Sequence, residues 1–331
     1  MRPSSLPPIL FEFHPVYKDY LWGGRRIPLR FHRPDCPAGR CAESWEVADR
    51  PDGMSHVKRG PFDGMTLQQL VRDYANELIG APAAVFPLLV KILDAAETLS
   101  VQVHPDEETA RRLGGDPKTE CWFVLDTEPD AICRLGLKPG TTPQQLRNAL
   151  ATDTIADYLQ CFHPIPGQLL YVPAGRVHAI GPGCLFLEVQ QNSNTVYRLY
   201  DWNRRDPTTG KPRTLHVEEA ITAIRWNDPD VSIIPPEPWI TQNSLRKRTR
   251  LSTPFFQIEE LEIWAPTLIE KSSRRFDILF ALENSARIET DADSRLFRYG
   301  STLLIPAVAE RYQLHPQTVP LRLLRIGPPL S

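Results

Sequence analysis

The hydrophobic positions of the chain fall mostly into short runs that are bounded by turn residues. Such runs, when rich in branched and aromatic residues, are typical of β-strands, and closely spaced strands are typical of barrels and sandwiches. Strands are expected, among other places, at Leu88–Leu93, Leu99–His104, Cys121–Asp126, Leu169–Val172, Leu185–Gln190 and Thr195–Tyr200. A second strand-rich region runs from Phe255 to Ile326. The pattern therefore predicts a mainly β protein.

Three segments carry helical signals instead. Two of them begin with a threonine followed three residues later by a glutamine, which is the capping-box pattern of a helix start. The predicted helices run from Thr66 to about Leu78, from Thr142 to about Leu159, and from Val217 to Trp226. Gly80 is the expected stop of the first helix, and Pro143 occupies the first helical position of the second.

Composition and charge exclude several classes of function. The net charge is −2 with acids and bases mixed along the chain, which argues against a nucleic-acid groove. The apolar stretch Leu78–Val90 is too short to span a bilayer, and the N-terminus lacks a secretory signal. Six cysteines without a CxxC pair are expected to be free thiols in a reducing compartment. We therefore expect a cytoplasmic protein with no membrane or nucleic-acid partner.

Four polar residues form a candidate metal site. The pattern Gly167-x5-Pro173-x-Gly175-x2-His178 is the second histidine motif of the cupin barrels, in which the glycine bend turns the histidine into the barrel. Upstream, Gln102 and His104 are two residues apart and project from the same face of a strand, while Glu120 opens the next strand. Two imidazoles, a carboxylate and an amide oxygen suit zinc best, with iron, cobalt or manganese possible. For each residue, a structural role in the core is the alternative.

The same motif returns in altered form near the C-terminus. The segment Gly167–His178 aligns without gaps on Gly300–Arg311, and the turn glycine, the strand and the Pro-Ala dipeptide are kept. Val308 and Arg311 replace the second glycine and the histidine. A repeat of this kind predicts two related barrels, of which only the first has metal ligands. With a proline-rich turn after Ile233 as the boundary, we expect domains over residues 1–240 and 241–331.

Several longer motifs resemble one family, the type I mannose-6-phosphate isomerases in their short bacterial form. The resemblance covers most of the chain, and its motifs are Phe13–Gly23, Cys41–Val47, Val90–Ala95, Leu99–Asp106, Lys118–Trp122, Val172–Gly181 and Gln191–Arg198. It implies two cupin-like (jelly-roll) barrels with a few helices packed beside the first. It also implies zinc-dependent interconversion of mannose 6-phosphate and fructose 6-phosphate through an enediolate, with a phosphorylated hexose as the partner.

The resemblance also implies roles for individual residues. The zinc ligands would be Gln102, His104, Glu120 and His178, and Arg198 matches the arginine that the family places at the catalytic centre. The planar guanidinium of Arg198 could bind either the enediolate or the phosphate.

Two further candidates are less specific. Lys118 precedes Glu120 by two residues and is a candidate for substrate contact, and Glu188 is a candidate for the proton-transferring base. A structural role is the alternative for Lys118, and a carboxylate that orients a metal ligand or an arginine would look the same as Glu188 in the sequence. For Arg198 the alternative is a structural salt bridge. Lys91 and Glu43 lie in family-like motifs, but their positions in the sequence suggest no role.

The sequence departs from the family at Asn194, where related sequences usually have aspartate, and at Gln168, where aspartate is frequent. The change at Asn194 could alter the preferred sugar. Two other functions are therefore kept open. The first is a metal-dependent cupin oxygenase or another sugar-modifying enzyme, and an oxygenase would hold iron with more histidines and consume dioxygen. A non-catalytic sugar-binding protein would have lost its ligands, as the second barrel has.

Overall fold

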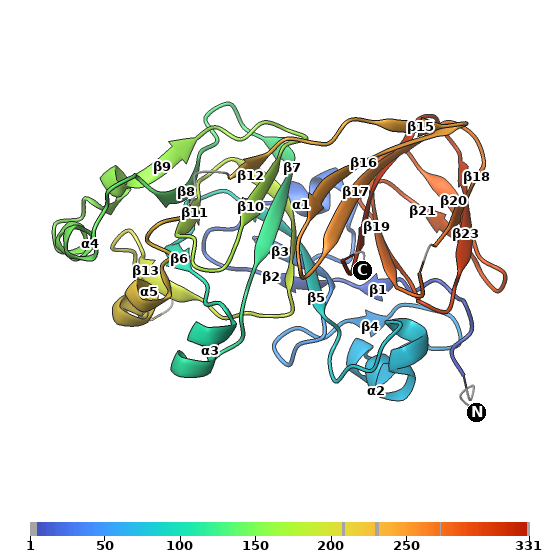
Figure 1. Ribbon diagram of the computed structural model, residues 1–331, viewed down its shortest axis with the longest axis horizontal. Helices are drawn as coiled ribbons and strands as arrows, with labels where there is room; N and C mark the ends of the chain where they lie inside the picture. The colour runs from blue at the N-terminus through green and yellow to red at the C-terminus, as the bar shows by residue number, and fades with distance from the viewer. Residues whose placement is uncertain (1–4, 207–208, 229–231, 272, 330–331) are drawn as a thin grey trace. The chain divides into compact units, whose positions relative to one another are not determined.

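The computed structural model describes residues 5–206, 209–228, 232–271 and 273–329, and its fold is mainly β as predicted (Figure 1). The chain forms two compact units. We call residues 17–44 and 90–234 the first barrel unit, and residues 1–16, 45–89 and 235–331 the second barrel unit. Both units are discontinuous in sequence, whereas the predicted domains, 1–240 and 241–331, are continuous. No helix in the described part of the chain is long and apolar enough to cross a membrane.

Two antiparallel sheets build the first barrel unit. Strands β2, β3 and β5 each also include residues that are assigned to the second unit. The seven-stranded sheet has the order β14 (Ile233–Ile234), β10 (Leu169–Val172), β7 (Glu120–Thr127), β12 (Cys184–Gln191), β5 (Leu88–Ala95), β3 (Glu43–Val47) and β2 (Val16–Lys18). The five-stranded sheet has the order β13 (Tyr197–Tyr200), β6 (Val101–Val103), β11 (His178–Ile180), β8 (Cys133–Leu137) and β9 (Leu159–Phe162). Side chains from both sheets, such as Trp122 and Leu135, share one buried cluster, so the core lies between the sheets.

The second barrel unit repeats this plan. Its six-stranded sheet has the order β15 (Ile240–Gln242), β16 (Leu245–Ser252), β17 (Gln257–Ile263), β24 (Leu321–Gly327), β19 (Asp277–Glu283) and β22 (Thr302–Ile305). Its four-stranded sheet has the order β18 (Thr267–Glu270), β23 (Arg311–Pro316), β20 (Ala286–Glu289) and β21 (Ser294–Phe297). A short sheet of β1 (Phe13–His14) and β4 (His56–Val57) also belongs to this unit.

The strand orders of the two units correspond one to one over eight strands. The series β10-β7-β12-β5 matches β22-β19-β24-β17, and the series β6-β11-β8-β9 matches β18-β23-β20-β21. The turn glycines of the sequence repeat, Gly167 and Gly300, both have positive φ, at 86° and 70°. His178 and Arg311 are the first residues of β11 and β23. The sequence repeat is therefore a repeat of strand, turn and strand. Among the described strands of the second unit, β13 has no counterpart.

The helix starts are predicted better than the helix ends. Helix α2 (Leu67–Leu78) has the expected capping box, in which the Thr66 hydroxyl accepts from the Gln69 amide. Helix α4 (Pro143–Ala151) has the same start but ends well before Leu159, because Asp153 adopts a left-handed conformation with φ 57°. A 3-10 turn η1 (Ile155–Tyr158) and strand β9 follow it. Helix α5 (Val217–Ala223) is also shorter than predicted, since Ile224 is extended.

Two short helices are absent from the sequence prediction. They are α1 (Arg26–Arg30) and α3 (Glu107–Leu113), and Asp106 caps the second by accepting from the Thr109 amide. Helices α1, α3, α4 and α5 belong to the first barrel unit, and α2 belongs to the second.

Candidate metal centre and active-site pocket

Three strands bring the four predicted ligands together. On β6, Val101 and Val103 point into an apolar cluster, so that Gln102 between them faces the other way. Gln102 is the direct cross-strand neighbour of His178 at the start of β11. His104 follows β6, and Glu120 is the first residue of β7. The long-range pairing of strands thus collects residues that are far apart in sequence.

The distances within this group are short and its members are buried. His104 Nε2 lies 3.5 Å from Glu120 Oε2, and His178 Nε2 lies 3.4 Å from Glu120 Oε1. One potential ligand atom from each of these three residues lies within 4.8 Å of the other two. Each of the three residues is only 1% exposed. They are the one such group found among the described residues.

Backbone carbonyls fix the orientation of both histidines. His104 Nδ1 lies 2.8 Å from the Thr195 carbonyl oxygen, and His178 Nδ1 lies 2.9 Å from the Arg176 carbonyl oxygen. Because a carbonyl can only accept, each Nδ1 must donate, and a neutral ring then has its lone pair on Nε2. Both lone pairs face the Glu120 carboxylate.

The electrostatics of the group favour a bound cation. Burial lowers the pKa of His104 to about 3, and the positive charge of Lys118 adds to this effect. Burial also lowers the pKa of His178. Burial raises the pKa of Glu120, but the neighbouring positive charge of Lys118 and the contacts with His104 outweigh it, so the net shift is downward. Two neutral imidazole lone pairs and an ionised carboxylate therefore face a common space, and three acceptors placed in this way fit a metal ion.

Gln102 completes the group once its side-chain amide is rotated by a half-turn. Its Nε2 lies 3.1 Å from His178 Nε2, and its Oε1 accepts from the Ser100 hydroxyl at 3.3 Å. The two ends of an amide are nearly indistinguishable in shape, and a half-turn exchanges them. After that half-turn, the Gln102 oxygen would face the same space as the two imidazoles.

A row of alternating charges extends from the carboxylate ligand along one wall. Lys118 Nζ lies 2.7 Å from Glu120 Oε2 and 3.8 Å from Glu188 Oε1. Lys91 Nζ lies 3.1 Å from the same Glu188 oxygen and 3.8 Å from Glu43 Oε2. All five side chains are buried. The two sequence candidates Lys118 and Glu188 thus lie beside the metal group.

Within this row, Glu188 has the electrostatics of a proton carrier. Burial raises the pKa of Glu188, and the charge of Lys91 only partly offsets the rise. Its Oε2 accepts from the Trp122 indole at 3.2 Å. Burial lowers the pKa of Lys91, but the charges of Glu188 and Glu43 outweigh it, so Lys91 stays a cation. A carboxyl group with a raised pKa exchanges protons more readily near neutral pH.

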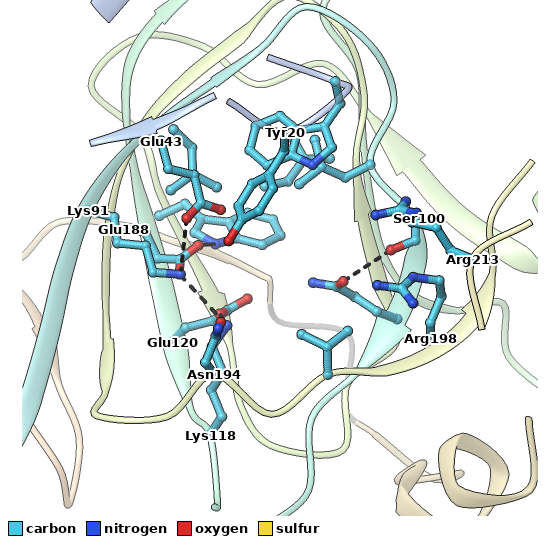
Figure 2. Close-up of a pocket in the computed structure, with 17 residues that line it drawn as sticks. Tyr20, Glu43, Lys91, Ser100, Lys118, Glu120, Glu188, Asn194, Arg198 and Arg213 are labelled. Carbon is cyan, nitrogen blue, oxygen red and sulfur yellow. Dashed lines mark hydrogen bonds and ion pairs between the residues drawn. The ribbon is translucent and has the colours of Figure 1, made fainter. Parts of the chain in front are cut away.

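Gln102 and Glu120 of the metal group, and the lysines and glutamates of the charged row, line one cavity of about 360 Å³ (Figure 2). Its remaining polar lining includes Ser100, Asn194, Arg198 and Arg213, and its aromatic lining includes Tyr20, Trp22 and Trp122. Figure 2 shows Arg198, Arg213 and Ser100 on one side of the cavity and Lys91, Glu188 and Glu43 on the other.

Arg198 lies close to the metal group. It is the cross-strand neighbour of Gln102, on β13, and its NH1 donates to the Thr214 carbonyl at 2.8 Å. Its Nε is buried without a partner among the described residues. Burial and the nearby charge of Arg213 lower the pKa of Arg198. The predicted residue therefore lines the pocket with part of its hydrogen-bonding capacity unused.

Sequence reasoning missed a role for three lining residues. Lys91 carried a weak signal, as the one charged residue inside the apolar run Leu88–Leu93, but its partner Glu43 lies on another strand. Arg213 carried no signal, since it lies in a loop with no recognisable motif.

Comparison with known proteins agrees with this geometry. The family described as phosphomannose isomerase type I, catalytic domain, matches residues 10–125. A mannose-6-phosphate isomerase of Streptococcus mutans is 33% identical over 88% of this chain and 91% of its own length. The solved mannose 6-phosphate isomerase of Bacillus subtilis is 28% identical, with a TM-score of 0.88 over 96% of this chain and 99% of that chain.

A second solved structure shares the fold at lower identity. It is a mannose 6-phosphate isomerase bound with zinc and yttrium, 16% identical, with a TM-score of 0.72 over 97% of this chain and 100% of that chain. The extent and identity of the Streptococcus mutans match show the family directly. This chain belongs to the type I mannose-6-phosphate isomerases.

Proposed function

We infer that this chain is a metal-dependent aldose–ketose isomerase that interconverts mannose 6-phosphate and fructose 6-phosphate. One observation carries the inference beyond family membership. The ionised carboxylate of Glu120 lies 3.4–3.5 Å from two neutral imidazoles, and it lines a cavity that also holds a carboxyl group with a raised pKa and two arginines. The cavity thus combines a cation site, a proton carrier and groups that can bind an anion.

The proposed metal ion is zinc, held by His104, Glu120, His178 and the flipped amide of Gln102. Two nitrogen and two oxygen donors form the borderline-soft set that zinc prefers, and zinc can also accept a further ligand. When bound, the ion supplies positive charge that stabilises negative charge on a substrate oxygen. Iron, cobalt or manganese would also fit this donor set.

The side chains around the metal group then have distinct proposed roles. Isomerisation moves a proton between carbons 1 and 2, and an enediolate forms between the two transfers. We assign the proton transfers to Glu188, because burial raises its pKa and it faces the cavity beside Lys118. Lys118 is assigned to contact with the substrate oxygens. Arg198 is assigned to the enediolate, since it lies directly across the sheet from the ligand Gln102.

The two alternative functions make different demands on the same pocket. An oxygenase would be expected to hold iron with more histidines, whereas only two histidines belong to the metal group. A sugar-binding protein without catalysis does not require two buried, neutral imidazoles that can bind a metal ion. The catalytic domain is proposed to comprise the first barrel unit, and its cytoplasmic location stays a prediction.

A coupled assay on mannose 6-phosphate tests this function. The enzyme as purified should form fructose 6-phosphate, lose that activity when chelated, and recover it when zinc returns. Full turnover in protein shown to be metal-free would contradict the mechanism. Consumption of dioxygen together with tightly bound iron would support the oxygenase instead.

A further inference from the structure

The pocket wall that carries Arg198 also carries a second guanidinium group, that of Arg213 (Figure 2). The Ser100 hydroxyl lies on the same side. The facing wall holds Glu43 and Glu188 with their lysine partners, so the charges there are largely paired. The arginine wall is therefore the side of the cavity that suits an anionic part of a ligand.

One buried carboxylate holds Arg213 in this place. Asp201, which follows strand β13, is 5% exposed and accepts from Arg213 Nε at 2.8 Å and also from Arg213 NH2. It accepts from Arg204 NH2 at 2.6 Å as well. Burial raises the pKa of Asp201, but the hydrogen bonds from the two arginines outweigh it, so the net shift is downward. Asp201 therefore remains ionised and binds two guanidinium groups, of which only that of Arg213 lines the cavity.

The backbone around Asp201 is built for this arrangement. Trp202 and Asn203 both have positive φ, at 56° and 53°, a conformation that disfavours ordinary side chains. The turn is held by the Trp202 indole, which donates to the Leu99 carbonyl at 2.7 Å, and by Arg204, which donates to the Thr98 carbonyl. The strained turn is thus anchored to the segment that leads into Ser100, another residue of the same wall.

The charges of this group are not balanced within the wall. Arg198 and Arg213 both line this wall, whereas Asp201, the carboxylate that binds Arg213, does not line the cavity. A guanidinium group that is already oriented loses little entropy when it binds an oxyanion, and its planar donors fit phosphate oxygens. The excess positive charge therefore matches a phosphate dianion.

We propose that Asp201 is a positioning residue that holds Arg213 on the cavity wall, and that Arg213 there binds the phosphate group of the substrate. The proposal rests on the proposed function, because it takes a hexose 6-phosphate as the substrate. Carbon 6 is at the opposite end of the sugar chain from carbons 1 and 2. The reacting carbons then lie beside the metal group and Glu188, and the phosphate lies beside Arg213.

The test uses the zinc-loaded enzyme and four variants: Arg213→Gln, Asp201→Asn, Arg204→Gln and the double variant of the first two. The kcat and KM for mannose 6-phosphate are measured together with the affinity for inorganic phosphate by calorimetry. Losing one charged hydrogen-bond partner should raise the KM and weaken phosphate binding by about 10- to 100-fold in Arg213→Gln, with a smaller change in kcat. Metal content and thermal unfolding show whether each variant is folded and loaded.

The positioning role of Asp201 makes its own prediction. Asp201→Asn should raise the KM less than Arg213→Gln does, and the double variant should have the same KM as Arg213→Gln alone. Arg204→Gln is the matched control, because it removes a guanidinium from the same carboxylate without removing one from the cavity. Its effect on KM should be the smallest of the three.

Several outcomes would overturn this inference without touching the isomerase itself. They are an unchanged KM and phosphate affinity in Arg213→Gln, a loss confined to kcat, or full additivity in the double variant. By contrast, wild-type protein that does not convert mannose 6-phosphate would overturn the proposed function. In that case the phosphate titrations would still decide whether Arg213 binds this anion.

Discussion

Glu120 and Asp277 occupy the same position in the two barrel units, as the first residues of the matched strands β7 and β19. Each has a cation two residues before it, Lys118 in the first unit and Arg275 in the second. In the first unit, Glu120 faces two imidazole lone pairs. In the second, Asp277 lies 3.2 Å from the Tyr312 hydroxyl and 3.7 Å from Arg275 Nε. The same strand order therefore supports two different clusters. In the first unit the carboxylate faces two imidazole lone pairs, whereas in the second it faces a hydroxyl and a guanidinium group.

Each unit also has a buried ion pair beside this position, and the acidic and basic partners are exchanged between the two units. Glu188 lies across from the second residue after Glu120, and Arg325 lies across from the second residue after Asp277. Glu188 pairs with Lys91, whereas Arg325 pairs with Glu259, its Nε lying 2.8 Å from Oε2. The second unit thus keeps the buried charges but pairs them with one another. What distinguishes the first unit is the pair of imidazole Nε2 lone pairs beside its carboxylate.

The largest effect is expected from removing a ligand histidine. His178→Ala should abolish metal binding and lower turnover by at least about 10³-fold, since several kcal/mol of transition-state stabilisation would be lost. Arg311→Ala is the matched control at the repeated position, where the side chain is exposed and pairs with the exposed Asp291. It should keep both metal and activity. Metal analysis and the coupled assay measure the two variants side by side, and equal losses in both would break the comparison.

The next effect concerns Arg198 on β13. Among the described strands of the second unit, β13 has no counterpart beside β18. Arg198→Ala should keep the metal and lower kcat by about 10²- to 10³-fold, as expected when one donor to an oxyanion is removed. Arg198→Lys keeps the charge but loses the planar donors, so it should recover only part of the activity. Loss of metal in Arg198→Ala would contradict the assigned role.

How far the sequence could predict this site depends on how local each feature is. The position of His178 follows from a local turn, in which Gly167 and Gly175 take positive φ, so a motif reveals it. Arg213 lies in a loop outside the quoted motifs, and only the structure shows that it lines the cavity and donates to Asp201.

The predicted bounds of the helices show the same difference between local and long-range features. The start of α4 is set by local capping and was predicted, whereas its end depends on the left-handed Asp153 and was not. The pattern of residues does not predict which residues that are far apart in sequence come together in the fold.

In the second unit, breaking the reversed ion pair should cost stability and leave catalysis alone. Among the described residues, Arg325→Met would leave the buried Glu259 with Arg275, 3.9 Å away, as its one paired cation. The free energy of unfolding should fall by about 3–5 kcal/mol. Glu283→Gln, which removes an exposed partner of Arg322, is the control and should cost less than about 1 kcal/mol. Denaturant unfolding measures both, and an unchanged KM in Arg325→Met should confirm that the cavity is intact.

The buried imidazoles should give the first unit a distinct response to acid. The pKa of His104 is about 3 in the folded protein, against an ordinary value of about 6.5 in the unfolded chain. As the pH falls below 6.5, the unfolded chain takes up a proton that the folded protein refuses, so the stability present above that pH is progressively lost. For the metal-free protein this amounts to about 2 kcal/mol by about pH 5.

Replacing this histidine should flatten the pH profile. Unfolding of metal-free His104→Gln, followed from neutral pH to about pH 5, should show a smaller slope than the wild type. His56→Asn, which removes an exposed histidine of the second unit, is the matched control variant. If His104→Gln has the same slope as the wild type, the His104 imidazole of the wild type is charged in the folded metal-free protein. The argument that a neutral imidazole is ready to bind a metal ion would then fail.

The smallest effects come from the capping boxes, one in each unit. Thr66→Ala and Thr142→Ala each remove a hydroxyl that accepts from a helix amide, at 3.0 Å in α2 and 3.3 Å in α4. Each should cost about 1 kcal/mol, and the serine variants, which keep the hydroxyl, should cost less. Thr66 is half-buried and Thr142 is exposed, so water can replace the lost bond more easily in α4. The free energy of unfolding should therefore fall more in Thr66→Ala, as measured by denaturant unfolding, and the reverse order would show that the local bond geometry outweighs access to solvent.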